Sequence, residues 1–411
     1  MSLLSINIIN YMNDYNDLPK SILSSYVSAN TINLSQGDQR YYGSLIPPIN
    51  DLKKIKLFRF EVNSKRNSIK CKQLDLHNNV NVHLFKPKYF TNENGEAICV
   101  VPNMEVLAHT IKGLYLYSKW LGIDDIGIEY HINNTSIPVL DKIKINNRIV
   151  ICRVESIIQY MFIEWLLEIG IDFDTVRKYS INFELNRLKR NLSISKLDNL
   201  FKKFKNDINY QEFDLESDYF IVVNLKYKNN DVTLIQLTWG ESMAEQIATA
   251  ISKEINVKKC AIIGGVAYIG PGQAQIDDIF IPTGILNNLN KQVHINNRIN
   301  ESINNKLFAN KSIWQGLQAS VTTTFDCLSN SEKIINIPEK VNSIDMELSG
   351  FIKGMSLSIE LGLIYYIMDL PYQGIGLGET YYNYDFLYKL FSNFNRGKYY
   401  CFEKALNFII N

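Results

Sequence analysis

The chain has 411 residues and a mass of 47.4 kDa, and its 43 Lys and Arg residues against 42 Asp and Glu residues give a net charge of +1. This length predicts two or three domains. Hydrophobic residues make up 46% of the sequence and charged residues 21%, which excludes a largely disordered chain. Because the charges balance, the chain has no overall positive field of the kind that attracts nucleic acid.

The cysteines, the histidines and the apolar runs exclude further classes of protein. Six cysteines are scattered without a CxxC pair, and the five histidines form no HExxH motif. This pattern argues against a zinc site and indicates reduced thiols in a cytoplasmic protein. No window reaches the roughly 18 continuous apolar residues of a membrane-spanning helix. The first 20 residues also lack the basic flank of a secretory signal. We therefore expect a soluble cytoplasmic protein without a metal or bound cofactor.

Residues 1–145 predict a smaller N-terminal α/β domain that no motif identifies. Residues 1–50 are loop-rich, and short β-like runs, among them KLFRFEV and AICVVP, follow up to residue 102. Residues 103–121 have helical periodicity, and IGIEYHI predicts another strand after them. The role of this domain stays open at the level of sequence.

Residues 146–411 predict a second α/β domain with a core from 216 onward and a charged helical insertion at about 175–215. Alternating strands and helices, with continuous apolar strand runs, predict a central mixed sheet with helices on both faces. The predicted elements are a strand at RIVICRV, a helix at SIIQYMFIEWLLEIG, a hairpin from YFIVVNLKY and VTLIQLTW, a helix over 241–255, strands at CAIIGG, DIFIPTG and LIYYIMDLP, a helix over 349–362, and closing helices at NYDFLYKLF and YYCFEKALNFII.

Two segments of the chain, 90–131 and 227–265, share a turn–strand–helix–strand pattern with similar spacing. Few residues are identical between them. Either the N-terminal domain is a decayed second copy of part of the C-terminal one, or two ordinary α/β units coincide in spacing.

Three places in the C-terminal half carry residues suited to chemistry. A buried strand is expected to end at Gly264-Gly265, where glycines let the backbone approach a ligand. Asp345 and Glu347 lie at an expected helix start, where Asp345 caps the helix or Glu347 holds paired sugar hydroxyls. Asp369 ends an apolar strand, where it either takes part in an active site or caps the next turn.

In their order these elements resemble the purine nucleoside phosphorylase and nucleosidase superfamily, over the C-terminal half of the chain. The matching segments are YKNNDVTLIQLTWGES, VKKCAIIGGVAYIG, DDIFIPTG, TTTFDCL, the Met-Glu pair in SIDMELSG, and the strand that ends in aspartate. The resemblance implies a nucleoside phosphorylase-like fold and cleavage of the N-glycosidic bond of a nucleoside or nucleotide-derived metabolite. Hydrolysis needs no cofactor, whereas phosphorolysis takes phosphate as a co-substrate.

The resemblance also implies roles for the residues that bind the sugar and the base. Glu347 would bind the ribose hydroxyls, and Met346 would pack under the sugar. Phe325 falls where the superfamily stacks an aromatic ring on the base. Asp369 falls where the superfamily places the acid that protonates the leaving purine.

Further residues match the phosphate and pocket positions of the superfamily. Gly264 and Gly265 would line the base and ribose pocket. Ser242 lies at the helix start where phosphorylases gather phosphate, and a helix N-terminus there suits an anion. Glu241 is the candidate for orienting the attacking water or phosphate.

Several departures leave a second function open. No arginine lies between Arg190 and Arg298, although phosphorylases usually supply arginine to phosphate. Arg153 would lie near the phosphate if its strand is the counterpart of the superfamily's opening strand, and Met368 stands where serine usually precedes the aspartate. The alternative is a catalytically inactive relative that binds a nucleoside-like ligand or serves as an assembly module. Both readings expect a small nucleoside or nucleotide as partner, no membrane or nucleic acid, and a homo-oligomer.

Overall fold

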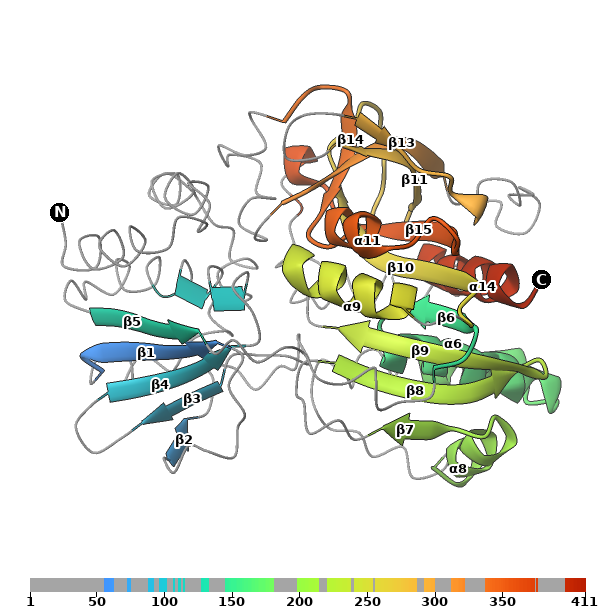
Figure 1. The fold of residues 1–411 in the computed structure, drawn as a ribbon. Coiled ribbons are helices and arrows are strands. Elements are labelled where there is room, and N and C mark those ends of the chain that lie inside the picture. The colour runs from blue at the N-terminus through green and yellow to red at the C-terminus, as the bar shows by residue number, and fades with distance from the viewer. Residues whose placement is uncertain are drawn as a thin grey trace.

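The described strands form two sheets, one of five strands and one of ten, which Figure 1 shows as separate units. The computed structural model describes residues 55–62, 72–74, 88–91, 96–101, 106–107, 110–111, 114, 127–132, 145–180, 198–213, 220–237, 240–253, 256–286, 292–299, 312–321, 337–373, 375 and 396–411. The predicted helix at NYDFLYKLF, the whole segment 1–54 and Phe325 lie outside these residues.

The ten-stranded sheet contains every strand that the structure describes from residue 148 onward. Its strands are β6 (Arg148–Ile151), β7 (Gln211–Phe213), β8 (Phe220–Tyr227), β9 (Asn230–Leu237), β10 (Lys259–Tyr268), β11 (Ile279–Leu286), β12 (Gln292–His294), β13 (Ile313–Ser320), β14 (Val341–Asp345) and β15 (Glu360–Asp369). The accompanying helices are α6 (Val154–Glu168), α8 (Asp198–Asp207), α9 (Glu241–Lys253), α11 (Leu348–Gly354), the short 3₁₀ helix η5 (Pro371–Gln373) and α14 (Gly397–Ile410).

The centre of this sheet is parallel, as its continuous apolar runs predict. β6 pairs in parallel with β9 and with β10, and β10 pairs in parallel with β15. The sequence predicts that the strands at 232–239, 259–264 and 363–369 are neighbours. That prediction is right for β10 and β15 and wrong for β9, because β6 lies between β9 and β10.

Five strands of the sheet close into a ring. β10 pairs with β14, β14 with β13, β13 with β11, β11 with β15, and β15 again with β10. β13 and β14 were not expected from the sequence, because their polar residues interrupt the apolar pattern of a strand. The ring holds the ends of β14 and β15 on opposite edges of β10.

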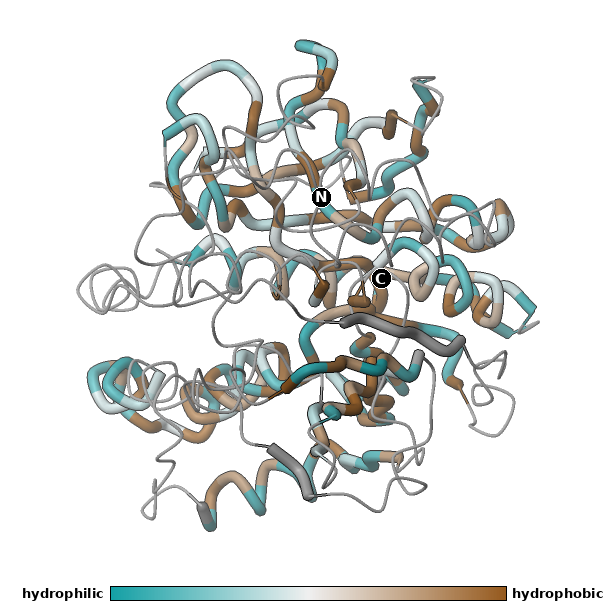
Figure 2. Tube along the Cα trace, turned by 90° about the vertical axis from the view of Figure 1, so that its left-hand side faces the viewer, coloured by the Kyte–Doolittle hydropathy of each residue, from teal (hydrophilic) through white to brown (hydrophobic). Residues whose placement is uncertain are grey.

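Helices cover both faces of the larger sheet. One apolar cluster joins the sheet to α6, α8 and α14, and a second joins the opposite face to α9 and α11. In α8, within the charged insertion, Phe204 is only 1% exposed and packs on Phe162 of α6. Figure 2 shows apolar and hydrophilic stretches alternating along the helices, as expected where each helix buries one side.

Two predicted boundaries in the C-terminal half are wrong. The sequence predicts that a strand ends at Gly264-Gly265 and that a loop follows, but β10 continues to Tyr268 with both glycines inside it, because β15 and β14 extend the ladder. The helix predicted over 349–362 ends at Gly354, and β15 begins at Glu360. Small polar residues between them form the turn that separates helix from strand.

The five-stranded sheet consists of β1 (Leu57–Val62), β2 (Lys72–Leu74), β3 (Lys88–Thr91), β4 (Glu96–Val101) and β5 (Gly127–Ile132). Its order is β2-β3-β4-β1-β5, and the order at one side of the larger sheet is β7-β8-β9-β6-β10. The two series correspond strand by strand in chain order. They also correspond in sense, since in each the first two pairings are antiparallel and the last two parallel.

The register of the two series agrees as well. Phe90 of β3 faces Gln73 on one side and Ile98 on the other. In the larger sheet Val223 of β8 faces Glu212 and Leu234 in the same way. The helical residues after β4 also repeat the spacing of the buried residues of α9. These are Val106, Leu107, Thr110, Ile111 and Leu114 in the first unit, and Met243, Ala244, Ile247, Ala248 and Ile251 in the second.

The contact between α9 and α11 generates the first prediction. A Cβ on Gly350 would lie 2.0 Å from the backbone oxygen of Glu241, and one on Gly354 would lie 2.4 Å from that of Glu245. Gly350→Ala should therefore lower the free energy of unfolding by about 1–3 kcal/mol, as overpacking does, although alanine normally favours a helix. Urea unfolding measures the change. The control Leu357→Ala, at a fully exposed residue, should stay within about 0.5 kcal/mol of the wild type; a stabilised Gly350→Ala would contradict the close contact.

Candidate active site

Ala267 of β10 is flanked by the two strands that lead to the expected acids Glu347 and Asp369. Its register partner on β14 is Ile344, and its register partner on β15 is Asp369. Because neighbouring strands are about 4.8 Å apart, these two partners are separated by roughly 10 Å across β10. Glu347 follows three residues after Ile344, at the N-terminus of α11. The fold therefore brings the start of α11 and the end of β15 to the same part of β10.

The side chains of this region are largely buried. Asp369 is 6% exposed and follows the apolar run of β15. Met346 is also 6% exposed and packs in a small apolar cluster that includes Ala267 and Ile344. Glu347 is partly buried, and its carboxylate accepts a hydrogen bond of 3.3 Å from the Met346 backbone N–H.

The two glycines of β10 are in close contact with side chains of β15. A Cβ on Gly264 would lie 3.0 Å from the ring of Tyr365, and a Cβ on Gly265 would lie 2.1 Å from the sulfur of Met368. Side chains of β15 therefore pack directly against both glycines. Their expected place in a base and ribose pocket stays a prediction.

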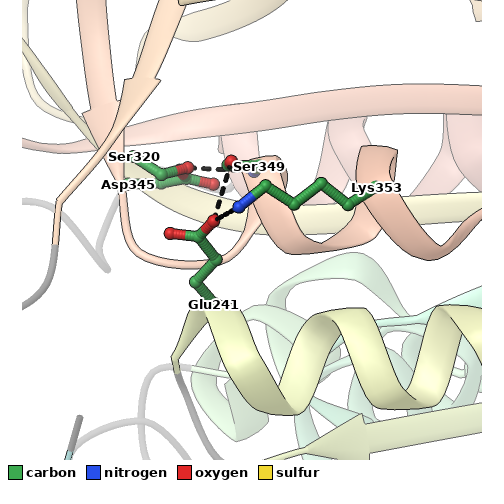
Figure 3. Close-up of polar contacts among 5 residues, drawn as sticks. All are labelled: Glu241, Ser320, Asp345, Ser349 and Lys353. Atoms are coloured by element: carbon green, nitrogen blue, oxygen red, sulfur yellow. Dashed lines mark hydrogen bonds and ion pairs between the residues drawn. The ribbon is translucent and has the colours of Figure 1, made fainter. Parts of the chain in front are cut away.

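A chain of hydrogen bonds links the start of α9 to the end of β14 through α11 (Figure 3). The Glu241 carboxylate accepts a hydrogen bond of 3.0 Å from the Ser349 hydroxyl and forms an ion pair with Lys353. The Ser349 backbone N–H donates to the Ser320 hydroxyl at 3.0 Å, and that hydroxyl donates to Asp345 at 2.8 Å. Glu241 is thus bonded to α11, the helix that begins directly after Glu347.

Asp345 closes this chain of hydrogen bonds and is also bonded to the start of α11. Its second carboxylate oxygen accepts a hydrogen bond of 2.9 Å from the Leu348 backbone N–H, the first N–H of α11, from a position two residues before the N-cap residue Glu347. Burial raises the pKa of the Asp345 carboxyl to about 7, although the hydrogen bonds from Ser320 and Leu348 oppose the shift. The carboxyl is therefore protonated more readily than that of an exposed aspartate.

Buried polar side chains lie near the carboxyl groups of Asp345 and Glu347. Burial, together with the charges of Asp345 and Glu347, raises the pKa of Tyr365 well above its ordinary value, so its hydroxyl stays protonated. Gln318 of β13 interacts with both Asp345 and Tyr365, and it stands in register with Ser343 of β14.

The polar atoms of this group lack hydrogen-bond partners of good geometry. The Gln318 amide, the Ser343 hydroxyl and the Tyr365 hydroxyl are all buried and make no such bond within the described part of the chain. Buried polar atoms are normally satisfied by protein, water or ligand, so this is the part of the site best suited to receive a polar molecule. Sequence reasoning missed it, because Gln318 and Ser343 belong to no motif and their only signal is polarity within a buried strand.

The remaining expected residues are at the same edge of the sheet or outside the described residues. Ser242 is in the first turn of α9, half-buried. Arg153 directly precedes α6, at the end of β6, and its guanidinium is 3.6 Å from the Glu155 carboxylate. Phe325, expected to stack on the base, lies outside the described residues. Among the helices that the structure describes, none has both the length and the apolar character needed to cross a membrane.

Comparison with known proteins gives matches at the level of structure only. No protein-family model and no curated sequence matches the chain. A 5′-methylthioadenosine/S-adenosylhomocysteine nucleosidase from Helicobacter pylori is 11% identical, with a TM-score of 0.41, and the match covers 64% of this chain and 99% of that one. A uridine phosphorylase from Vibrio fischeri is 12% identical, with a TM-score of 0.39, and covers 68% and 97%.

A putative 5′-methylthioadenosine/S-adenosylhomocysteine nucleosidase from Borrelia burgdorferi, bound to adenine, is 18% identical, with a TM-score of 0.38 over 51% of this chain and 95% of that one. These proteins are nucleosidases and a nucleoside phosphorylase, the classes that the sequence motifs resemble. At these identities and TM-scores the likeness decides nothing about reaction or substrate.

The raised pKa of Asp345 generates a prediction for stability. Between its ordinary value of 3.8 and its folded value of about 7, the native chain holds a proton that the unfolded chain has released. The free energy of unfolding should therefore fall as the pH rises through this window, by up to about 1.4 kcal/mol per pH unit. Asp345→Asn removes the ionisation, so its stability relative to the wild type should improve from about pH 4.5 to pH 7. Urea unfolding across that range measures the difference, and a difference that is independent of pH would contradict the burial of this carboxyl.

Proposed function

We propose that this protein cleaves the N-glycosidic bond of a nucleoside or of a nucleotide-derived metabolite. The observation that carries the proposal is that β14, which leads to Glu347 at the start of α11, and β15, which ends at Asp369, pair with β10 on the two sides of Ala267. These are the two residues to which the sequence motifs give roles at the sugar and at the base.

The reaction makes demands that these two carboxyl groups can meet. N-glycosidic cleavage passes through an oxocarbenium-like sugar, as glycoside hydrolysis does. Glu347 would accept hydrogen bonds from the ribose hydroxyls and stabilise the positive charge that develops on the ring. Asp369 would deliver a proton to the departing base, and its burial shields that transfer from bulk water.

The buried polar side chains support a hydroxyl-bearing ligand. The Tyr365 hydroxyl, the Gln318 amide and the Ser343 hydroxyl are buried donors and acceptors that make no hydrogen bond of good geometry within the described residues, although Gln318 interacts with Asp345 and Tyr365. Met346 would pack under the sugar, as the resemblance implies, and Phe325 would stack on the base. Gly264 and Gly265 would contribute backbone beside the ligand.

The nucleophile is water or phosphate. Ser242 lies in the first turn of α9, where helix N–H groups suit an anion. Arg153, the arginine that the sequence suggests as a phosphate ligand, has its guanidinium 3.6 Å from the Glu155 carboxylate. Hydrolysis therefore needs fewer assumptions than phosphorolysis, which would use phosphate as a co-substrate. No other cofactor enters the proposal.

The proposal also assigns the two parts of the chain. Residues 146–411 would carry the reaction, and residues 1–145 would be a partial second copy of the same unit. The matching order, sense and register of β1–β5 and β6–β10 support this duplication. No counterparts of β11, β13, β14 and β15 are described in the five-stranded sheet, and those are the strands around which Glu347 and Asp369 are arranged. A cytoplasmic location and self-association of the chain belong to the same proposal.

Base release tests the proposed reaction. The purified chain should release free base from at least one member of a panel of adenosine, 5′-methylthioadenosine, S-adenosylhomocysteine, uridine and AMP, followed by chromatography with and without phosphate. Asp369→Asn should lower turnover by about 10²–10⁴-fold, the usual contribution of a general acid, with little loss of thermal stability. Glu347→Gln should weaken substrate affinity as well as rate. If the wild type binds nucleosides but releases no base, the inactive relative becomes the better description.

The number of sites per chain tests the assignment of the two units. Among the described residues, the strands that place Glu347 and Asp369 belong to the C-terminal unit. Titration calorimetry of the slow variant Asp369→Asn with the panel nucleoside that the wild type cleaves should therefore give one binding equivalent per chain. Adding Glu347→Gln to this variant should weaken that binding, because Glu347 meets the ribose, without leaving a second, unaffected phase. Two equivalents, or a residual site of unchanged affinity in the variant, would show that the N-terminal unit binds ligand independently.

A further inference from the structure

We propose that Glu241 is a positioning residue, whose carboxylate holds α11 in place and thereby sets the position of Glu347. The inference rests on the proposed function, in which Glu347 meets the sugar. It replaces the role in orienting water or phosphate that the sequence suggested for Glu241. The contacts of Glu241 carry the inference, because they run to the helix that begins directly after Glu347.

The first step is the contact between Glu241 and α11. One carboxylate oxygen of Glu241 receives both the Ser349 hydroxyl, at 3.0 Å, and the Lys353 ammonium group. Ser349 and Lys353 are one helical turn apart, so the carboxylate holds α11 at two successive points on the same side. Figure 3 shows Glu241 reaching from the end of α9 to both residues.

The second step is the backbone contact between Glu241 and Gly350, which brings α9 and α11 close together. A Cβ on Gly350 would come within 2.0 Å of the Glu241 backbone oxygen, so the two helices meet there without an intervening side chain. Glu241 therefore contacts α11 through its carboxylate and through its own backbone. A shift of α11 relative to α9 has to break the side-chain bonds or separate this contact.

The third step connects the hold to Glu347 itself. The backbone N–H of Ser349 is bonded to Ser320, and the backbone N–H of Leu348 is bonded to Asp345. Asp345 also accepts the Ser320 hydroxyl. Hydrogen bonds therefore fix Asp345, before Glu347 in the chain, and Leu348 and Ser349, after it. Glu241 adds a further bond to Ser349.

The energetics favour positioning over stability as the purpose of this contact. The side chain of Lys353 is 42% exposed and that of Glu241 is 26% exposed. Ion pairs with this much exposure contribute little to folding stability. Placement is different, because a displacement of about 1 Å in a group that meets the substrate can cost roughly 100-fold in rate.

Three variants separate positioning from catalysis. Glu241→Ala removes both contacts and should lower kcat/KM by about 10-fold, as the loss of a supporting residue commonly does. Glu241→Gln keeps an acceptor for the Ser349 hydroxyl and should retain most of the activity, with the pH profile unchanged in shape. The control is Glu245→Ala, one turn further along α9 on an exposed side chain, which should match the wild type. A loss of about 10²–10⁴-fold in Glu241→Gln, with one limb of the pH profile missing, would mark a catalytic carboxylate and overturn the proposal.

Hydrogen exchange gives a readout that needs no substrate. In Glu241→Ala, the backbone amides of 346–351 should exchange about 2- to 10-fold faster than in the wild type, the effect of losing hydrogen bonds of ordinary strength. Glu245→Ala should leave them unchanged. Unchanged exchange in Glu241→Ala would overturn the positioning role whether or not the protein is active. Faster exchange in a protein that releases no base would uphold the positioning role and refute the proposed reaction instead.

Discussion

The close backbone contact between α9 and α11 is the constraint on which the site depends. It exists because Gly350 and Gly354 have no Cβ where α9 presents the backbone oxygens of Glu241 and Glu245. At this distance Glu241 can reach both Ser349 and Lys353. The start of α11 is therefore held in place by α9 and by the ends of β13 and β14, without any ligand.

β10 joins the two parts of the large sheet, β6 to β9 on one side and the ring strands β11, β13, β14 and β15 on the other. Its first residues pair with β6, and its last residues pair with β14, while β15 follows it along nearly its whole length. This arrangement closes the ring of strands and sets Asp369 opposite Ala267. It also places Tyr365 and Met368 of β15 directly against Gly264 and Gly265.

The sequence could predict those parts of the structure that depend on local pattern. The hairpin of β8 and β9, the helix α9 and the core strands β10 and β15 follow from apolar runs and turn residues. β13 and β14 could not be recognised, because Gln318 and Ser343 owe their burial to strand pairing rather than to their own chemistry. The bonds of Glu241 were equally hidden, because Ser349 and Lys353 are more than 100 residues away in the chain.

Comparison of the two sheets shows why the described part of the N-terminal unit has no counterparts of Asp345, Glu347 and Asp369. The shared order, sense and register cover five strands and the helix between the fourth and fifth, which is more than any single crossover motif requires. The correspondence stops at β5 and β10, and in the larger sheet the chain then adds β11, β13, β14 and β15. Since Asp345 lies within these added strands, Asp369 ends one of them and Glu347 directly follows another, a copy that ends at the fifth strand keeps the scaffold and loses the chemistry. Under the proposed reaction the acids therefore belong to the C-terminal unit, because the strands that place them are described there and have no described counterpart in the five-stranded sheet.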